Sequence, residues 1–253
     1  STSDLTINTT KDFVDKNVTF VSGQDINIAG TLTKATGTGT ANYLFQAKRN
    51  IYNSNNAGIG ATTGAINLTL QADYDANSDG AISLTGGTFN SNGGNINLGG
   101  GSGTISAGTG YAFGNATYTS GVSIASTITA AGGNIAINGT GANLATNVNN
   151  GVTFSGATVT TTGAGTISVY GTGRGITNSA NNYGIGILAG SRLTTVDGAL
   201  LLNGSGGGAG SGSGNLGVAI ANGGSLVSTT GTGNMTIFGS GGNNSGTGSG
   251  NGG

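Results

Sequence analysis

Short runs in which apolar and polar residues alternate recur along the whole chain. Alternation over four or five residues is the period of a half-buried β-strand and not of a helix. The runs are organised into repeats from Gly80 onward, because similar segments begin at Gly80, Gly121, Gly151, Gly184 and Gly217. The repeat length is about 33 residues, within the range that solenoids and propellers use.

Each repeat holds three such runs. The second run centres on an apolar residue, and the third begins with Gly. The centres of the second runs are Phe89, Ile128, Val159, Leu193 and Leu226. The third runs are GNINL (94–98), GNIAI (133–137), GTISV (165–169), GALLL (198–202) and GNMTI (233–237). Gly-Gly, Thr-Gly and Asp-Gly between the runs supply the positive φ angles that tight corners require.

Three short strands per repeat predict an all-β solenoid, in which each coil lies on the previous one and equivalent residues stack. One coil cannot bury its own apolar face, so stability has to come from this stacking. Two interior ladders are predicted: Ile135, Ile167, Leu200 and Met235 in the first, and Ile137, Val169, Leu202 and Ile237 in the second.

The same reading divides the chain into three parts. Residues 1–79 are irregular N-terminal coils, residues 80–238 are the regular repeats, and residues 239–253 are a flexible tail or a truncated repeat loop rich in Gly, Ser and Asn. Gly/Asn-rich corner loops follow the third strands at 139–150, 171–183 and 204–216, and we expect them to stack into a ridge on one side.

Composition excludes several other classes of protein. The chain has 55 Gly and no Pro, Cys, His or Trp, so neither a helical bundle nor a disulfide scaffold nor a Cys/His zinc site is expected. The formal net charge of −1 offers no electrostatic surface for nucleic acid. No apolar run reaches the length that crosses a bilayer. Disorder is not expected either, because the chain is 34% hydrophobic.

Several segments resemble a known family of repeats. They are SGQDINIAGTL (22–32), GAINLTLQADYDANSDGAISLTGG (64–87), SNGGNINLGGG (91–101) and the Asn-Asn-Tyr-Gly of 181–184. They are similar to the repeats of filamentous-haemagglutinin-like large exoproteins, which are adhesins of the two-partner-secretion type, and of related autotransporter passengers. The resemblance implies a right-handed parallel β-helix that is secreted and displayed at a bacterial cell surface.

The segment from Asp73 to Asp79 is the sharpest candidate site. Asp75, Asn77 and Asp79, followed by Gly, match the start of a calcium loop, with oxygen ligands at alternate residues and Gly for the tight turn. Asp73 is a further candidate ligand, but the bidentate Glu of such loops is replaced by Gly86. The alternative is a turn in which these carboxylates cap local backbone N–H groups.

Catalysis has few side chains to use, since His, Glu and Cys are absent, and we expect no enzyme. Lys48 and Arg49 are predicted to form surface ion pairs and not to complete an active site around the Asp73–Asp79 loop. Tyr111, Tyr118, Tyr170 and Tyr183, with Arg174 and Arg192, lie in or near the corner loops and are candidate contacts for a glycan or a partner chain.

These observations favour a structural role as a rod segment of an extracellular bacterial adhesin or filament. The array ends inside a repeat without a polar cap, which motivates a hypothesis of end-to-end self-association or of binding to other surface proteins. One alternative is a glycan-binding or glycan-cleaving solenoid that contacts host or environmental glycans. Another is ice binding, for which the Thr-containing columns after the second-strand residues are not regular.

Overall fold

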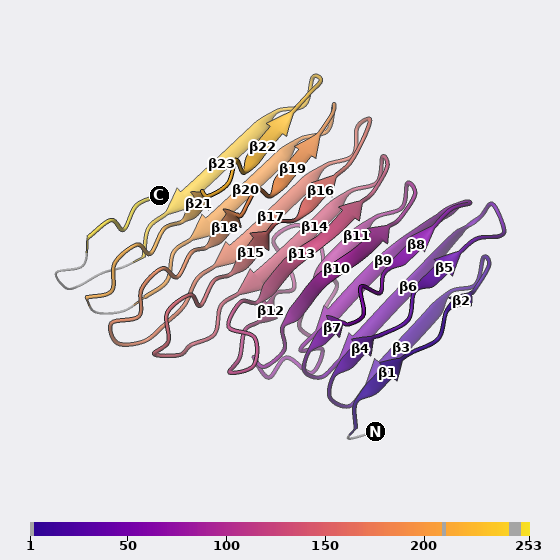
Figure 1. Cartoon of the computed structure of the whole chain (residues 1–253), viewed down its shortest axis with the longest axis horizontal. Coiled ribbons are helices and arrows are strands. Elements are labelled where there is room, and N and C mark those ends of the chain that lie inside the picture. Colours follow the sequence, from indigo (N-terminus) through magenta and orange to yellow (C-terminus); the bar gives the residue numbers. More distant parts are fainter. Residues whose placement is uncertain (1–2, 209–210, 243–248) are drawn as a thin grey trace.

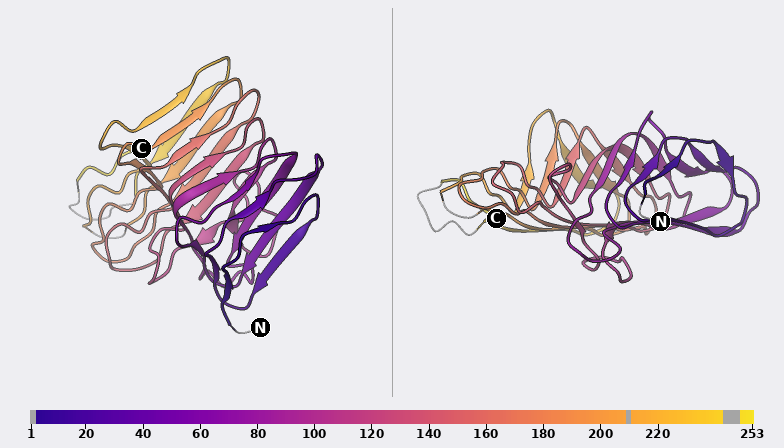
Figure 2. Two further views of the ribbon diagram at one scale, coloured as in Figure 1. Left: turned by 45° about the vertical axis from the view of Figure 1, so that its right-hand side comes forward. Right: turned by 90° about the horizontal axis from the view of Figure 1, so that it is seen from below.

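The computed structural model of the chain describes residues 3–208, 211–242 and 249–253. These residues form a parallel β-helix of eight stacked coils (Figures 1 and 2). Six coils contribute two strands each to a 14-stranded sheet, and the two coils of β10 and β13 contribute one long strand each. Each coil contributes one strand to a 9-stranded sheet, whose ninth strand is β12, and all strand pairs between coils are parallel. The prediction of an all-β solenoid with three strands per coil is therefore confirmed.

The strands have equivalent places in successive coils. The first strands are β1 (Leu5–Ile7), β4 (Ile26–Ile28), β7 (Ile51–Asn53), β10 (Ile82–Asn90), β13 (Val122–Thr129), β15 (Val152–Ser155), β18 (Ile185–Leu188) and β21 (Val218–Ile220). The second strands are β2 (Lys11–Asp12), β5 (Leu32–Lys34), β8 (Ile59–Ala61), β16 (Thr158–Thr160), β19 (Arg192–Thr195) and β22 (Leu226–Thr229), while β10 and β13 run through both places. The third strands are β3 (Val18–Ser22), β6 (Thr40–Ala47), β9 (Ala65–Ala72), β11 (Ile96–Gly100), β14 (Ile135–Thr140), β17 (Ile167–Thr172), β20 (Leu200–Ser205) and β23 (Met235–Ser240), and β12 (Ala112–Phe113) pairs with β14.

The predicted interior ladders are confirmed by the strand register. Ile135 pairs with Ile167, Ile167 with Leu200 and Leu200 with Met235. The interior residues are fully buried as far as Leu200, whereas Met235, in the last coil, is 49% exposed because no further coil covers it among the described residues. Stacking therefore buries an apolar column that a single coil would leave in water.

The alignment of the repeats needs two corrections. Val227, and not Leu226, pairs with Leu193, because the turn before β22 is one residue longer than the turn before β19. In the first regular repeat Ile82 pairs with Val122, which places Ala81 and not Gly80 opposite Gly121. Gly80 instead forms an isolated antiparallel bridge with Phe113.

The N-terminal region forms three complete coils. The alternating runs of this region are DLTI (4–7), NVTFVSG (17–23), DINIAGTL (25–32), YLFQA (43–47) and AINLTLQA (65–72). They coincide with β1, β3, β4 and the first residue of β5, β6 and β9. Three short strands, β2, β7 and β8, were not predicted from the sequence. None of these three strands has two large apolar residues at alternate positions: β2 is Lys11–Asp12, and the second inward residues of β7 and β8 are Asn53 and Ala61. Their pairing with neighbouring coils therefore determines them.

A column of glycines explains why the third runs begin with Gly. A Cβ atom built on Gly198 would lie 1.8 Å from the carbonyl oxygen of Gly165 in the preceding coil. The same close approach occurs between Gly133 and Gly94, at 1.9 Å. Only glycine lets the backbones of successive coils approach so closely at this corner.

One lysine is part of the interior. The side chain of Lys34 is completely buried at the end of β5. Its ammonium donates to the carbonyl oxygens of Thr36, Gly37 and Thr63 and lies 2.8 Å from Oδ1 of Asp15. The hydrogen bond from Lys34 lowers the pKa of Asp15. The buried charge is thus paired and hydrogen-bonded, and it ties together the corners of three coils.

The Gly/Asn-rich corner loops stack into the predicted ridge, which Figure 1 shows for the loops that follow β14 and β17. Backbone hydrogen bonds join equivalent loop residues, including Val148 N–H to the carbonyl of Ala180 and Asn181 N–H to that of Ser213. The predicted tail, residues 239–253, lies partly outside the described residues. Within the described part, Asn251 accepts a hydrogen bond from the backbone N–H of Asn215, at 2.8 Å.

Candidate functional site

The Asp73–Asp79 segment forms a turn directly after β9. The Asp73 side chain is completely buried, and its Oδ1 accepts the backbone N–H groups of Asn77 at 2.9 Å and Ser78 at 3.1 Å. The N–H of Asp79 is 3.4 Å from the same oxygen. Asp73 therefore caps the turn internally, as the alternative to the calcium loop predicts.

The other three candidate ligands are exposed at the surface of this turn. Asp79 accepts a hydrogen bond from Nδ2 of Asn115 at 2.7 Å, and Nδ2 of Asn77 lies 3.4 Å from Asp75. Within the described residues, no group of three or more acidic side chains is close enough to hold a metal ion. The turn therefore holds all four candidate side chains, but the Asp73 carboxylate accepts hydrogen bonds from backbone N–H groups of the same turn.

Burial governs the electrostatics of Asp73. Removal of the carboxylate from water raises its pKa, and the backbone N–H groups of Asp79, Asn77 and Ser78 offset only part of that increase. Burial raises the pKa because it disfavours the charged form, while hydrogen bonds to the carboxylate favour that form.

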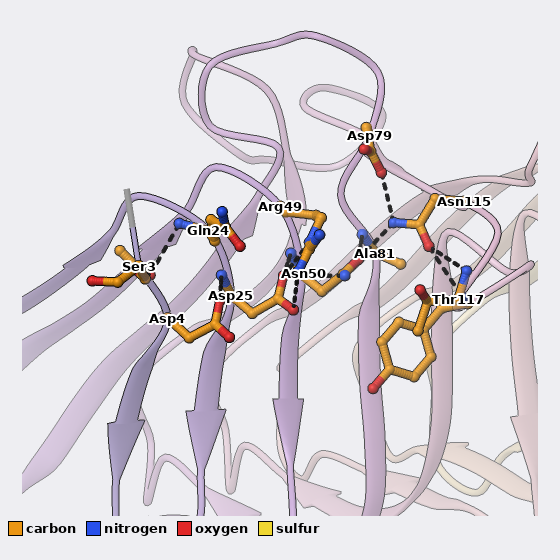
Figure 3. Close-up of polar contacts among 12 residues, drawn as sticks. Ser3, Asp4, Gln24, Asp25, Arg49, Asn50, Asp79, Ala81, Asn115 and Thr117 are labelled. Atoms are coloured by element: carbon orange, nitrogen blue, oxygen red, sulfur yellow. Dashed lines mark hydrogen bonds and ion pairs between the residues drawn. The ribbon is translucent and has the colours of Figure 1, made fainter. Parts of the chain in front are cut away.

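A polar ladder precedes the first strands of the N-terminal coils, as Figure 3 shows. The Asp4 carboxylate accepts the backbone N–H of Asp25, and Asp25 accepts that of Asn50 at 2.9 Å. Asn50 continues the ladder, because its Oδ1 accepts the N–H of Ala81 at 3.0 Å and a side-chain N–H of Asn115 at 2.8 Å. Each hydrogen bond from a backbone N–H in this ladder connects one coil to the next.

Arg49 completes this ladder as a surface ion pair. Its Nε and Nη2 donate to the two oxygens of Asp25 at 2.7 and 2.9 Å. Partial burial would raise the pKa of Asp25, but the bonds from Arg49 and Asn50 outweigh it and lower the pKa. The predicted surface pairing is confirmed for Arg49, whereas Lys48 is exposed.

The C-terminal coils use a different ladder at the same corner, built from buried asparagines. The Asn182 Oδ1 atom accepts the backbone N–H of Asn149 at 2.8 Å, and Asn215 Oδ1 accepts the backbone N–H of Asn182 at 3.0 Å. The side-chain amides also bond to one another, at 3.1 and 2.9 Å. Asn149 and Asn182 are completely buried. The sequence signal for this ladder is an Asn that lies two residues before the first Gly of a repeat, at Gly151, Gly184 and Gly217.

The candidate contact residues of the corner loops do not all meet at one site. Tyr170 lies against the 101–110 loop, where a Cβ atom on Gly108 would be 3.1 Å from its Cε1, and it acts electrostatically on Tyr111. The Arg174 guanidinium lies 5.5 Å from the ring centroid of Phe113, and the ring of Tyr118 lies 6.2 Å from that of Tyr52. Burial raises the pKa of Tyr111 and of Tyr118. Arg192 instead lies on the outer surface of β19.

The outer side of the 9-stranded sheet is hollowed next to the loop of residues 101–110. Segments of this coil, coloured purple, project from the body in the right-hand view of Figure 2. One depression of about 440 Å³ lies on one side of Ile105, and a second of about 300 Å³ shares Ile105 and Asn97 with it. A third, of about 420 Å³, lies between this loop and Asp73. The sequence pattern does not predict this surface, because no local signal in residues 101–110 shows that the loop lies against the sheet.

The Thr columns relevant to ice binding lie on the outer side of the 14-stranded sheet. With the corrected register, one column reads Asn90, Thr129, Thr160, Thr194 and Ser228. The parallel column two residues earlier contains Thr127 and Thr158 but continues with Arg192 and Leu226. The face is therefore not a regular threonine array.

Comparisons of the chain with protein-family models, with curated proteins and with solved structures give no match. Among the described residues, the structure also has no helix with the length and apolar character needed to cross a membrane.

Proposed function

We propose that the protein is a rigid structural segment of an extracellular bacterial adhesin or surface filament. One observation carries this proposal: the strand register continues from coil to coil over all eight coils, with a dry apolar column inside. Polar ladders at the corners join the same coils by side-chain hydrogen bonds. A solenoid of this kind is held by interactions between neighbours along its axis, which suits a load-bearing rod.

A structural role is also favoured over catalysis by the placement of the acidic groups. Asp73 is occupied by backbone N–H groups, and Asp25 by Arg49 and Asn50. Asp79 accepts from Asn115. These carboxylates are used within the fold.

Self-association through the last coil is part of the proposal. Ile237 is 43% exposed and Phe238 is 60% exposed, and β21, β22 and β23 have one unpaired edge among the described strands. Unpaired strand edges next to apolar side chains are templates for β-augmentation. The first coil offers the opposite edge, where Phe13 and Phe20 are partly buried against the core.

The resemblance to filamentous-haemagglutinin-like repeats supports the extracellular placement within this proposal. It rests on the segments at 22–32, 64–87 and 91–101, which form parts of β4 and of β9 to β11. A surface without strong charge is compatible with an adhesin that contacts other surface proteins.

Sedimentation velocity over a range of protein concentrations tests the proposal. We expect oligomers that grow with concentration, and we expect Ile237→Lys to abolish them. Ile176→Lys is the matched control, since Ile176 is exposed to a similar extent, 41%, but lies in the corner ridge. A strict monomer at all concentrations would refute self-association. Release of oligosaccharides from a polysaccharide panel would refute the structural role itself.

A further inference from the structure

The two depressions beside Ile105 form one shallow trough on the outer side of the 9-stranded sheet, which we call the outer trough. Its lining includes Leu44, Thr69, Asn97, Ile105, Ala136 and Ser168. We propose that the outer trough binds an uncharged, hydroxyl-rich glycan chain. This site is separate from the Asp73–Asp79 loop and from the coil ends.

The wall of the trough is held in place by two side-chain amides of the sheet. Nε2 of Gln71 donates to the carbonyl oxygens of Gly101 and Gly103. The Gln71 side chain is held in turn by Gln46, whose Nε2 donates to Gln71 Oε1 at 2.9 Å. From a later coil, Nδ2 of Asn138 donates to the carbonyls of Ser106, Thr109 and Gly110, and its Oδ1 accepts the N–H of Gly108. The 101–110 loop is therefore anchored at both ends before any ligand binds, which limits the ordering cost of binding.

Close contact between this loop and the sheet depends on Gly99. A Cβ atom at Gly99 would lie 2.2 Å from the carbonyl oxygen of Gly110 and 2.9 Å from Cγ2 of Ile105. Ile105 is only 5% exposed, so its side chain packs on β11 and forms the ridge between the two depressions.

The floor of the trough is a column of outward side chains in register. Leu44 pairs with Thr69, Thr69 with Asn97, Asn97 with Ala136 and Ala136 with Ser168. The strands of a sheet lie about 4.8 Å apart, so the column repeats its groups at a short, constant interval. A polymer with its own repeat can contact such a column at several points, which compensates for a shallow site.

The hydrogen-bonding capacity of this floor is available to a ligand. Within the described residues, the side chains of Thr69, Asn97 and Ser168 make no hydrogen bond to the protein, and all three are partly exposed. Amides and hydroxyls both donate and accept, as sugar hydroxyls do. Leu44, which is partly exposed, adds apolar surface for the C–H face of a sugar ring.

Charge selects the class of ligand. No Asp, Lys or Arg lines the outer trough, so an anionic or cationic ligand would lose hydration without gaining a partner. A neutral glycan loses less, because its hydroxyls exchange water for amides and hydroxyls of similar strength. The same absence of carboxylates means that the trough binds without cleaving.

The test is an NMR titration of the folded chain with neutral hexasaccharides, namely cellohexaose, laminarihexaose and maltohexaose. A sulfated heparin hexasaccharide and an uncharged peptide of Ser, Thr and Gly serve as the competing classes. We expect shifts of the Asn97 and Gln46 side-chain amide signals with at least one neutral hexasaccharide, and none with the heparin hexasaccharide or the peptide.

Thr69→Ala with Asn97→Ala removes two floor groups and should weaken binding by about tenfold or more, since each hydrogen bond contributes about 1 kcal/mol. Thr172→Ala with Asn203→Ala is the matched control, because these outward residues lie on the same sheet outside both depressions. Circular dichroism confirms that both double variants fold. Absence of shifts with all three neutral sugars, equal loss in the control, or stronger binding of the heparin hexasaccharide or the peptide would overturn the proposal. The sedimentation experiment tests the proposed structural role independently of this titration, since its variant Ile237→Lys lies in the last coil and outside the outer trough.

Discussion

The buried asparagine ladder makes the strongest prediction about stability. Asn182 is completely buried, and its side chain takes part in four hydrogen bonds: two from Asn149, one to the Ser179 hydroxyl and one to Asn215. Asn182→Ala removes all of them and leaves the backbone N–H of Asn149 buried without a partner. A net contribution of about 1 kcal/mol per bond predicts a loss of about 3 to 4 kcal/mol in the free energy of unfolding.

Asn42→Ala is the matched control for this prediction. Asn42 belongs to a second asparagine ladder, in which its Nδ2 donates to Asn17 and its Oδ1 accepts from Asn67, both at 3.0 Å. This ladder is exposed, so water replaces the lost bonds, and we expect a change of about 0.5 kcal/mol or less. The comparison therefore separates burial from the number of hydrogen bonds.

Urea unfolding followed by circular dichroism measures both free energies, and amide hydrogen exchange localises the effect. In Asn182→Ala, exchange at the Asn149 N–H should accelerate more than exchange in β4 to β6, because coils contact only their neighbours. Equal destabilisation by the two substitutions would refute the reasoning that burial makes this ladder important.

Three further predictions concern strain, pH and calcium. Val148 has a φ of 66°, which is costly for a β-branched residue, and the equivalent residue of the next coil, Asn181, has a φ of 56°. Val148→Asn should therefore raise the free energy of unfolding by about 1 kcal/mol and raise the melting temperature. An unchanged or lower melting temperature would contradict this. The pKa of Asp25 is lowered in the folded state, so the stability it contributes is present above its unfolded pKa of about 3.9 and is lost as the pH falls through the folded pKa. Asp25→Asn should therefore lower the melting temperature at neutral pH and reduce the decrease of the melting temperature on acidification. If the melting temperatures of the variant and the parent chain decreased in parallel as the pH fell, the stabilising role of the Asp25–Arg49 pair would be refuted. Because the Asp73 carboxylate already accepts backbone N–H groups, added calcium should leave the melting temperature unchanged; an increase that Asp75→Asn abolishes would instead establish a calcium site.

The parts of the fold that the sequence predicted are those with a repeated local signal. Alternation in 133–137 and 165–169, each opened by Gly, is sufficient to place the third strands and their ladders. By contrast, β7 and β8 were missed, because their second inward residues are Asn53 and Ala61 and not large apolar side chains. Their conformation follows from the coils on either side. The Leu226 assignment failed for a related reason: an extra turn residue shifts the register by one, and only strand pairing reveals the shift.

The amino-acid sequence by itself determined the class of fold, since stacked apolar runs separated by glycine corners have few other ways to bury their side chains. It also determined which loop would hold Asp73, but not what the carboxylate would do there. Tertiary structure decided that Asp73 turns inward to backbone N–H groups, that Lys34 is buried and that the 101–110 loop lies on the sheet over Gly99. These outcomes depend on contacts between residues far apart in the chain, and a local pattern carries no information about such distances.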